Sequence, residues 1–176
     1  VPFMNYGGPC AESAEVSNRL VAAAVEKARE LGADYLELRC AMPLETELPV
    51  SLRKVSMTIA LNPDPDVLWN AFTSKHRKNV RRAAKNGLEV RVGGIELLPD
   101  FYGVLERSWR DLGTPLYRSD YFRSILETFP DSTRIYLCCH EGQPVSVAFV
   151  GFQGGTAEGL WQGGLPQARA LDANYV

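Results

Sequence analysis

One stretch of positive charge, KHRKNVRRAAK at Lys75–Lys85, strongly limits what this chain can fold into. At about 100° per residue it separates an apolar arc from a basic arc, as expected for a surface helix that docks by one face. The apolar arc carries Phe72, His76, Val80, Ala83 and Ala84. The basic arc carries Lys75, Arg77, Lys78, Arg81, Arg82 and Lys85. We expect the helix to pack through Phe72, Val80 and Ala84.

The basic arc has two explanations. Six of the chain's 19 Lys and Arg lie on it, although the formal net charge is −2. Like charges at this spacing repel one another, and an anionic partner would relieve the repulsion. Alternatively, the arc is an ordinary solvated face whose charges pair with some of the 21 Asp and Glu. The balanced composition excludes a general nucleic-acid coat, which would be basic throughout.

Length and composition set further bounds. With 176 residues and 45% apolar content, the chain can form one domain or parts of two. Its longest apolar run, near Val145–Phe152, is far shorter than the roughly 20 residues that cross a bilayer, so we expect no transmembrane segment. The chain begins without Met in a strand-like sequence and ends at the predicted start of a helix, so we expect a fragment.

The cysteines indicate a reducing compartment. Cys10, Cys40, Cys138 and Cys139 lack the spacing of metal ligands, so we expect no metal site. We expect buried free thiols and a cytoplasmic location. If Cys138 and Cys139 lie on a strand, they point to opposite faces of it.

The hydrophobic pattern predicts a mixed α/β fold. Strands are predicted at Val1–Tyr6, Asp34–Arg39, Val55–Leu61, Leu88–Val92, Arg134–His140, Pro144–Gln153 and Ala157–Gly163. Helices are predicted from about Ser13 to Leu31, and at Asp66–Thr73, Lys75–Lys85, Leu98–Leu112 and Tyr121–Phe129. Tight turns at Glu141-Gly142 and Gly154-Gly155 should join the last three strands into an antiparallel meander.

The order of strand, two helices, antiparallel meander and new helix resembles the GNAT (acyl-CoA N-acyltransferase) fold. In that fold, a loop and a helix N-terminus after the meander bind the pyrophosphate of the acyl donor through backbone amides. The corresponding segment here is GLPQARALD at Gly164–Asp172, with one basic residue, Arg169. It lacks the Gly-rich, Arg-containing signature of acetyl-CoA enzymes. Either the donor is not a typical coenzyme A ester, or this module binds none.

Several motifs resemble one family within that superfamily. They are NYGGP at Asn5–Pro9, LELR at Leu36–Arg39, KVSMTIAL at Lys54–Leu61, LWNAFTSKHRKNVRRAAKNGLEV from Leu68, DLGTP at Asp111–Pro115 and the closing DANYV. Together they look like the FemAB-related proteins, which are similar to the aminoacyltransferases that build peptidoglycan bridges. The likeness is greatest to a bacterial subgroup found with exopolysaccharide and exosortase (PEP-CTERM) loci. Trp69–Leu88 is its most specific stretch.

The resemblance implies parts of two tandem GNAT-like modules. Residues 1–53 would be the C-terminal part of the first module plus a linker, and residues 54–176 the N-terminal part of the second. Family members transfer an aminoacyl group from aminoacyl-tRNA to an amine on a lipid- or nucleotide-linked precursor. The implied partners are therefore such an amine acceptor, tRNA and the membrane periphery. The implied donor is aminoacyl-tRNA or acyl-CoA, with no permanently bound cofactor.

The family's catalytic residues lie mostly in parts that this sequence does not match, so no catalytic residue is assigned. The substrate- or phosphate-binding candidates are Lys75, Lys78, Arg81, Arg82, Lys85 and Arg169. The cleft candidates are Asn5, Tyr6, Thr114, Trp161 and Gln162. Turn formation is the alternative explanation for the first three, and packing is the alternative for the last two.

The leading functional hypothesis is an N-acyltransferase that acts on an amine of a cell-envelope or polysaccharide-related acceptor. One rival is a noncatalytic module that binds an anionic polymer, RNA or a nucleotide-sugar through the basic helix. A second rival is a scaffold for envelope polysaccharide assembly. The Gly164–Asp172 segment separates these hypotheses. Amides that converge on an open cleft favour catalysis, whereas a side chain that fills the space favours binding or scaffolding.

Overall fold

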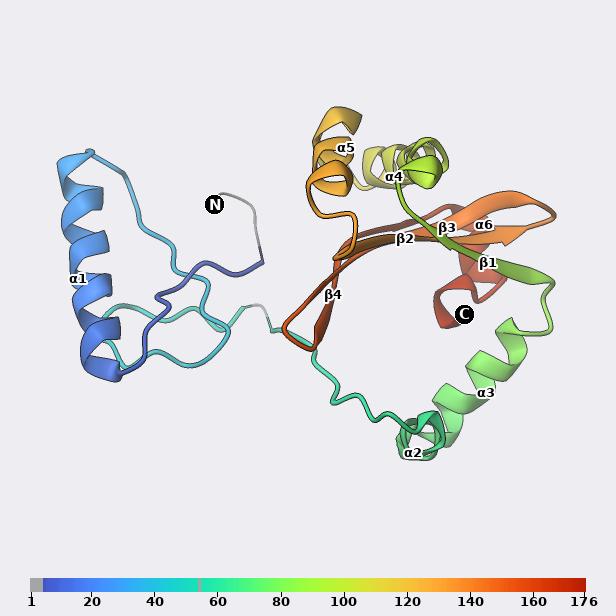
Figure 1. The fold of residues 1–176 in the computed structure, drawn as a ribbon, viewed down its shortest axis with the longest axis horizontal. Helices are drawn as coiled ribbons and strands as arrows, with labels where there is room; N and C mark the ends of the chain where they lie inside the picture. Colours follow the sequence, from blue (N-terminus) through green and yellow to red (C-terminus); the bar gives the residue numbers. More distant parts are fainter. Residues whose placement is uncertain (1–4, 54) are drawn as a thin grey trace. The chain divides into compact units, whose positions relative to one another are not determined.

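The computed structural model describes residues 5–53 and 55–176, and the chain divides into two compact units, Val1–Ala60 and Leu61–Val176. In the described part of the first unit, the regular element is α1 (Ala14–Glu30) (Figure 1). Its N-terminus is capped by Ser13, whose Oγ accepts from the Val16 amide at 3.3 Å. Gly32 (φ 61°) follows its C-terminus, as in many αL helix ends. The helix predicted here is confirmed.

The second unit contains the remaining elements. Its helices are α2 (Pro65–Ala71), α3 (Ser74–Ala83), α4 (Leu98–Asp111), α5 (Ser119–Thr128) and α6 (Pro166–Ala170), with short 3-10 turns η1 (Ile95–Leu97) and η2 (Ala173–Tyr175). Its strands are β1 (Leu88–Gly93), β2 (Thr133–His140), β3 (Gln143–Gln153) and β4 (Thr156–Gly164). The strands form one antiparallel sheet in the order β1-β2-β3-β4. Helices α4 and α5 lie over one face of this sheet (Figure 1).

The register confirms the predicted meander. Phe149 lies opposite Trp161 in the β3–β4 pair, and Ala148 lies opposite Gln162. The turn between β2 and β3 has positive φ at Glu141 (50°) and Gly142 (75°), as in the two-residue hairpin turns that match strand twist. The sequence therefore specifies the pairing of these strands through its turns as well as through its apolar pattern.

Two apolar clusters lie on opposite faces of the sheet. The larger one contains Phe101, Phe122, Phe149, Ile135 and Leu137, all fully buried between the sheet and α4 and α5. The smaller one joins Cys138 and Val145 to Ala168 and Ala173 of the C-terminal turns.

The two adjacent thiols of β2 follow this division. Cys139 belongs to the larger cluster and Cys138 to the smaller, as predicted for neighbours on a strand. Burial raises the pKa of both thiols, which keeps them protonated and unreactive. Cys10 is exposed and Cys40 is half-buried, so the expectation of four buried thiols is wrong for these two.

Two predicted strands are wrong. Asp34–Arg39 forms a single antiparallel bridge, between Gly7 and Arg39. Residues 55–61 have no regular structure, and Met57 is 90% exposed. Alternating apolar residues indicate a strand only when a partner strand supplies the hydrogen bonds, and the sequence pattern does not name that partner. The prediction for Val1–Tyr6 falls mostly on residues 1–4, outside the described residues.

Candidate anion-binding site

The predicted basic helix is α3. Thr73 caps its N-terminus, because its Oγ1 accepts from the His76 amide at 3.2 Å. After Ala83 the chain leaves the helix through a turn that ends at Gly87, whose φ is 64°. The helix predicted from the separation of basic and apolar residues is therefore present in the structure.

The apolar arc of α3 packs toward the C-terminal turn η2 (Figure 1). Ala83 is fully buried, and the His76 ring meets Tyr175 edge-on at 5.4 Å between centroids. Val80 is half-buried, as expected for this arc. Ala84 is exposed, so the expectation that it packs is wrong. Ala84 is the C-cap of the helix, so its side chain no longer follows the apolar arc that the helix presents to η2.

Two polar contacts fix the end of α3 to the C-terminal turns. The Asn86 amide Nδ2 donates to the Leu171 carbonyl at 2.8 Å. Arg82 binds the Asp172 carboxylate with both Nε and Nη2, and the Nη2–Oδ1 distance is 2.7 Å. The bond from Arg82 lowers the pKa of Asp172, and Asp172 in turn raises the pKa of Arg82. This bidentate pair has the geometry that gives the strongest arginine–carboxylate contacts.

The other two arginines of α3 also contact the protein itself. Arg77 Nη1 donates to the Asn70 carbonyl at 3.2 Å and to the carbonyl of Phe72, at the end of α2. The Arg81 guanidinium lies over the Trp69 ring, 5.2 Å from its centroid. These contacts join α2 to α3 and reduce the freedom of both side chains.

The three lysines of the basic arc differ from the arginines. Lys75, Lys78 and Lys85 are exposed, and no carboxylate in the described part of the chain lies within salt-bridge distance of them. Among the described residues, pairing with an acid therefore accounts for Arg82 alone. Arg77 and Arg81 contact carbonyls and a ring, and the three lysines face solvent. The arrangement can attract an anion with point charges, but it offers no preformed bidentate donor.

The Gly164–Asp172 segment, which the resemblance aligns with a donor-binding loop, is largely helical. Residues 166–170 form α6, and Leu165 and Ala168 are buried against the sheet. The Gly164 amide donates to Ser108 Oγ at 3.2 Å, and the Leu165 amide donates to the Val145 carbonyl at 2.9 Å. The amides of Gly164 and Leu165 are thus occupied by the protein's own acceptors. Arg169 is exposed near the end of α6, three residues before Asp172.

The cleft candidates divide among three places. Trp161 is 8% exposed and packs edge-on against Phe122, with 5.2 Å between ring centroids. Gln162 is exposed, and its carbonyl accepts from the Trp109 indole at 3.0 Å. Thr114 is exposed in the turn after α4. The structure therefore places Trp161 mainly in the core and leaves Gln162 and Thr114 accessible.

The two remaining cleft candidates, Asn5 and Tyr6, belong to the first unit. Both are exposed, and the Tyr6 hydroxyl donates to Ser56 Oγ at 2.9 Å. Each is described within that unit alone, and their role in a cleft stays a prediction.

Comparison with known proteins identifies the family. The FemAB family matches residues 13–142, which are 130 of the 176 residues. This chain belongs to the FemAB family.

Solved structures show which fold the FemAB chain shares. The crystal structure of FemX is similar with a TM-score of 0.57 at 14% identity, and the likeness covers 64% of this chain and 45% of FemX. The C-terminal domain of a putative lysylphosphatidylglycerol synthetase from Agrobacterium fabrum matches with a TM-score of 0.42 at 15% identity, over 58% of this chain and 34% of that one. No curated protein matches significantly. The chain thus spans less than half the length of FemX and shares its mixed α/β fold.

The FemAB chain has structural contacts around α3 and β4 that sequence reasoning missed. Asp172, Asn86 and Trp109 were not singled out, yet they hold the ends of α3 and β4 in place. Arg82 and Asp172 are 90 residues apart, and no local pattern marks such a pair. The sequence signal for Asp172 is that it is the one acidic residue of the Gly164–Asp172 segment, directly after α6.

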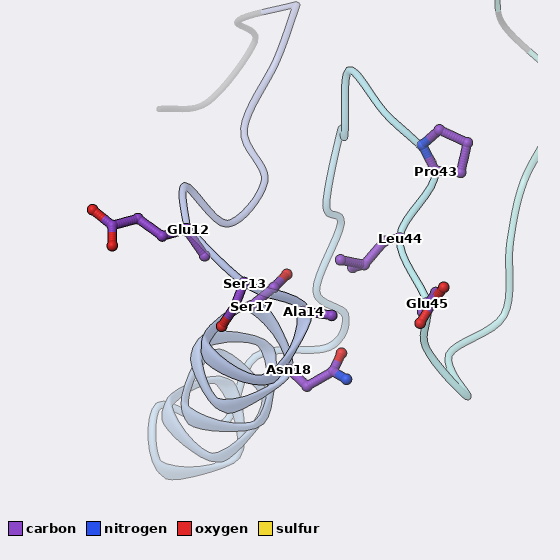
Figure 2. Close-up of a pocket in the computed structure, with 9 residues that line it drawn as sticks. Glu12, Ser13, Ala14, Ser17, Asn18, Pro43, Leu44 and Glu45 are labelled. Atoms are coloured by element: carbon purple, nitrogen blue, oxygen red, sulfur yellow. The ribbon is translucent and has the colours of Figure 1, made fainter.

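A shallow hollow lies elsewhere in the FemAB chain, in the first unit (Figure 2). It has a volume of about 350 Å³ and lies between the N-terminal turn of α1 and residues 43–45. Its lining includes Glu12 and Glu45, which disfavour a phosphate. Ser13 already caps the nearby amide of Val16. None of the predicted site residues lines this hollow, and we assign it no role.

Two features are absent from the described residues of the FemAB chain. None of its helices combines the length and apolarity that a membrane crossing requires. No group of three or more His, Cys, Asp or Glu among these residues is arranged to hold a metal ion.

Proposed function

We propose that this chain is part of a bacterial cytoplasmic N-acyltransferase that carries an acyl or aminoacyl group to an amine of a cell-envelope or polysaccharide-related acceptor. The observation that carries the proposal is the FemAB family match over residues 13–142. The fold shared with FemX supports it. The chain spans 45% of FemX, so the proposal concerns the activity of the whole protein to which this chain contributes.

Architecturally, we assign residues 54–176 to the earlier part of a second GNAT-like module and residues 1–53 to the later part of a first. The four-stranded antiparallel sheet with α4 and α5 on one face is compatible with this assignment. Donor and acceptor sites in a tandem arrangement would be completed by parts of the protein beyond this sheet.

The chemistry proposed is direct attack of the acceptor amine on an ester or thioester. A base removes the amine proton, and hydrogen-bond donors stabilise the oxyanion that forms. We assign no residue of this chain to the base. For the phosphates of the donor or acceptor we retain Lys75, Lys78, Arg81, Arg82, Lys85 and Arg169 as candidates. Arg82 can serve only by leaving Asp172 or by binding alongside it.

A noncatalytic binding module is the second candidate, and one observation favours it. Leu165 and Ala168 are buried where an acyl-donor loop would be expected, and the amides of Gly164 and Leu165 are already bonded within the chain. A module of this kind would use the basic face of α3 without donor chemistry. The rival scaffold hypothesis shares this observation, but it does not account for the basic face of α3.

Mass spectrometry separates the two functions. The full-length protein is incubated with coenzyme A esters or aminoacyl-tRNA and with amine-bearing envelope precursors, and heat-denatured protein serves as the control. We expect the acceptor to gain the mass of one acyl or aminoacyl group. If every donor and acceptor stays unmodified while RNA or a nucleotide-sugar is retained on the protein, the acyltransferase proposal is wrong and the binding module is correct.

A further inference from the structure

The charge of this protein is unevenly distributed. Residues 67–88 contain six of the 19 basic residues and none of the 21 acidic ones. The segment therefore carries +6, while the remaining 13 basic and 21 acidic residues give −8. Such a concentration costs self-repulsion, and the contact between Arg82 and Asp172 offsets one charge of it. The uncompensated charge is the property to be explained.

Among the described residues, three lysines of this segment have no salt-bridge partner, and we call them the lysine face. They are Lys75 and Lys78, which fall within about 60° of one another around α3, together with Lys85, which follows the C-cap of the helix at Ala84. All three are exposed on a convex helix surface. A convex row of point charges fits a broad anionic surface better than it fits a small ligand.

An aromatic side chain borders the lysine face. Arg81 lies between Lys78 and Lys85 on the helix surface, three residues after one and four before the other. Trp69 lies under Arg81 and is half-buried, and Val67 on the same short helix is 50% exposed. Basic residues bordered by Trp and exposed apolar side chains are typical of protein surfaces that lie at a membrane interface.

We propose that the lysine face of α3, with Trp69 at its border, binds the surface of a membrane that contains anionic lipid. The inference rests on the proposed function, since it names the partner of the same basic helix. Each lysine near an anionic leaflet strengthens binding about fivefold, and several together are needed for stable association. Binding there would hold the protein close to acceptors that are linked to lipid.

The contacts within α3 favour a membrane over a nucleic acid. The arginines, whose planar forks bind phosphates in bidentate fashion, are engaged by Phe72, Trp69 and Asp172. One face of the Trp69 ring is covered by Arg81, which removes it as a platform for stacking a base. Lysines act as point charges and require no fixed phosphate geometry, which suits a fluid layer of headgroups.

Vesicle sedimentation with the 176-residue chain tests the proposal. Vesicles of phosphatidylcholine containing roughly one third phosphatidylglycerol are compared with vesicles of phosphatidylcholine alone. The test variant is the triple change Lys75→Gln, Lys78→Gln, Lys85→Gln. The control variant, Arg19→Gln, Arg107→Gln, Arg123→Gln, removes the same charge from exposed positions outside α3. Circular dichroism of both variants checks that they remain folded.

We expect the chain to bind the anionic vesicles, the test variant to lose about tenfold or more of that binding, and the control variant to lose about twofold or less. The proposal would be overturned if the test and control variants bound the anionic vesicles equally. It would also be overturned if the unchanged chain bound neutral and anionic vesicles equally. A test variant that loses tRNA binding while its vesicle binding is unchanged would overturn it as well.

The outcome is separable from that of the acyltransferase assay, because sedimentation needs no donor. Acyl transfer by the full-length protein to a water-soluble amine without any vesicle binding removes this inference and keeps the proposed function. Vesicle binding through the lysine face without acyl transfer keeps this inference and removes the proposed function.

Discussion

At the scale of single residues, Asp172 shows how one contact can organise a surface. It has a left-handed backbone (φ 56°), directly after α6, and its side chain is 13% exposed. Aspartate tolerates this conformation better than most residues because its short side chain can bond locally. Arg82 supplies the matching positive charge from α3. The pair thus fixes the position of the basic helix while it neutralises one of the helix's own charges.

The pair makes stability depend on pH. Arg82 lowers the pKa of Asp172 in the folded state, so the unfolded chain takes up this proton first as the pH falls. The stabilisation is therefore complete above the ordinary aspartate pKa of about 3.9 and is lost as the pH falls through the lower, folded value. We expect wild type to lose more stability than Asp172→Asn between about pH 6 and about pH 3, measured by urea unfolding.

Asparagine is the suitable replacement, since it also tolerates the left-handed backbone and removes only the charge. The carboxylate of Glu96 also has a lowered pKa, but it is present in both proteins and cancels in the comparison. Identical pH profiles for wild type and variant would show that the Arg82–Asp172 contact does not stabilise the fold.

At the scale of elements, α3 is a helix that sequence periodicity predicts well and tertiary packing completes. Ala83 is fully buried on its docked side, whereas Ala84, the next residue, is exposed. Small side chains at such a contact let two elements approach closely. The docking arc is therefore narrower than the apolar residues of the sequence alone suggest.

This difference predicts that the same substitution lowers the free energy of unfolding at one position and leaves it nearly unchanged at the other. Ala83→Leu adds volume at a filled contact and should lower the free energy of unfolding by about 1–3 kcal/mol. Ala84→Leu adds the same volume in solvent and should change it by less than about 0.5 kcal/mol. Urea unfolding of both variants gives the comparison. Equal losses would mean that α3 is not docked through position 83.

The same elements show where prediction from sequence ends. The meander was predictable, because its turn residues and its alternating apolar residues specify the same pairing. Apolar and polar residues also alternate over residues 55–61, but the local sequence does not indicate whether a partner strand is present. These residues have no regular structure. Likewise the charge of α3 was predictable, whereas the engagement of its arginines was not. The Arg82 contact depends on a residue 90 positions away, and the contacts of Arg77 and Arg81 depend on how α2 and α3 pack together.

At the scale of the whole molecule, the two units differ in how they are stabilised. Both apolar clusters belong to residues 61–176. Among the described residues of the first unit, Val21 is the one hydrophobic side chain that is buried. Apolar burial is the dominant favourable contribution to folding, so independent stability should reside in the second unit.

Expressing the two units separately tests this difference. We expect residues 61–176 to unfold cooperatively with heat and to show the near-ultraviolet circular dichroism of packed aromatic side chains. Residues 1–60 alone should show no cooperative transition, because they bury too little apolar surface to offset chain entropy. A fragment 61–176 without a cooperative transition would show that its apolar clusters are insufficient.

The bonds from α4 to β4 also bear on self-association. A strand at the edge of a sheet can recruit a neighbouring chain through its outward backbone groups. At the end of β4, the Gln162 carbonyl is occupied by Trp109 and the Gly164 amide by Ser108. An extended segment that pairs with this edge therefore loses its partners before it reaches Gln162. Helix α4 thus limits how long a ribbon between two copies of this protein could grow along β4.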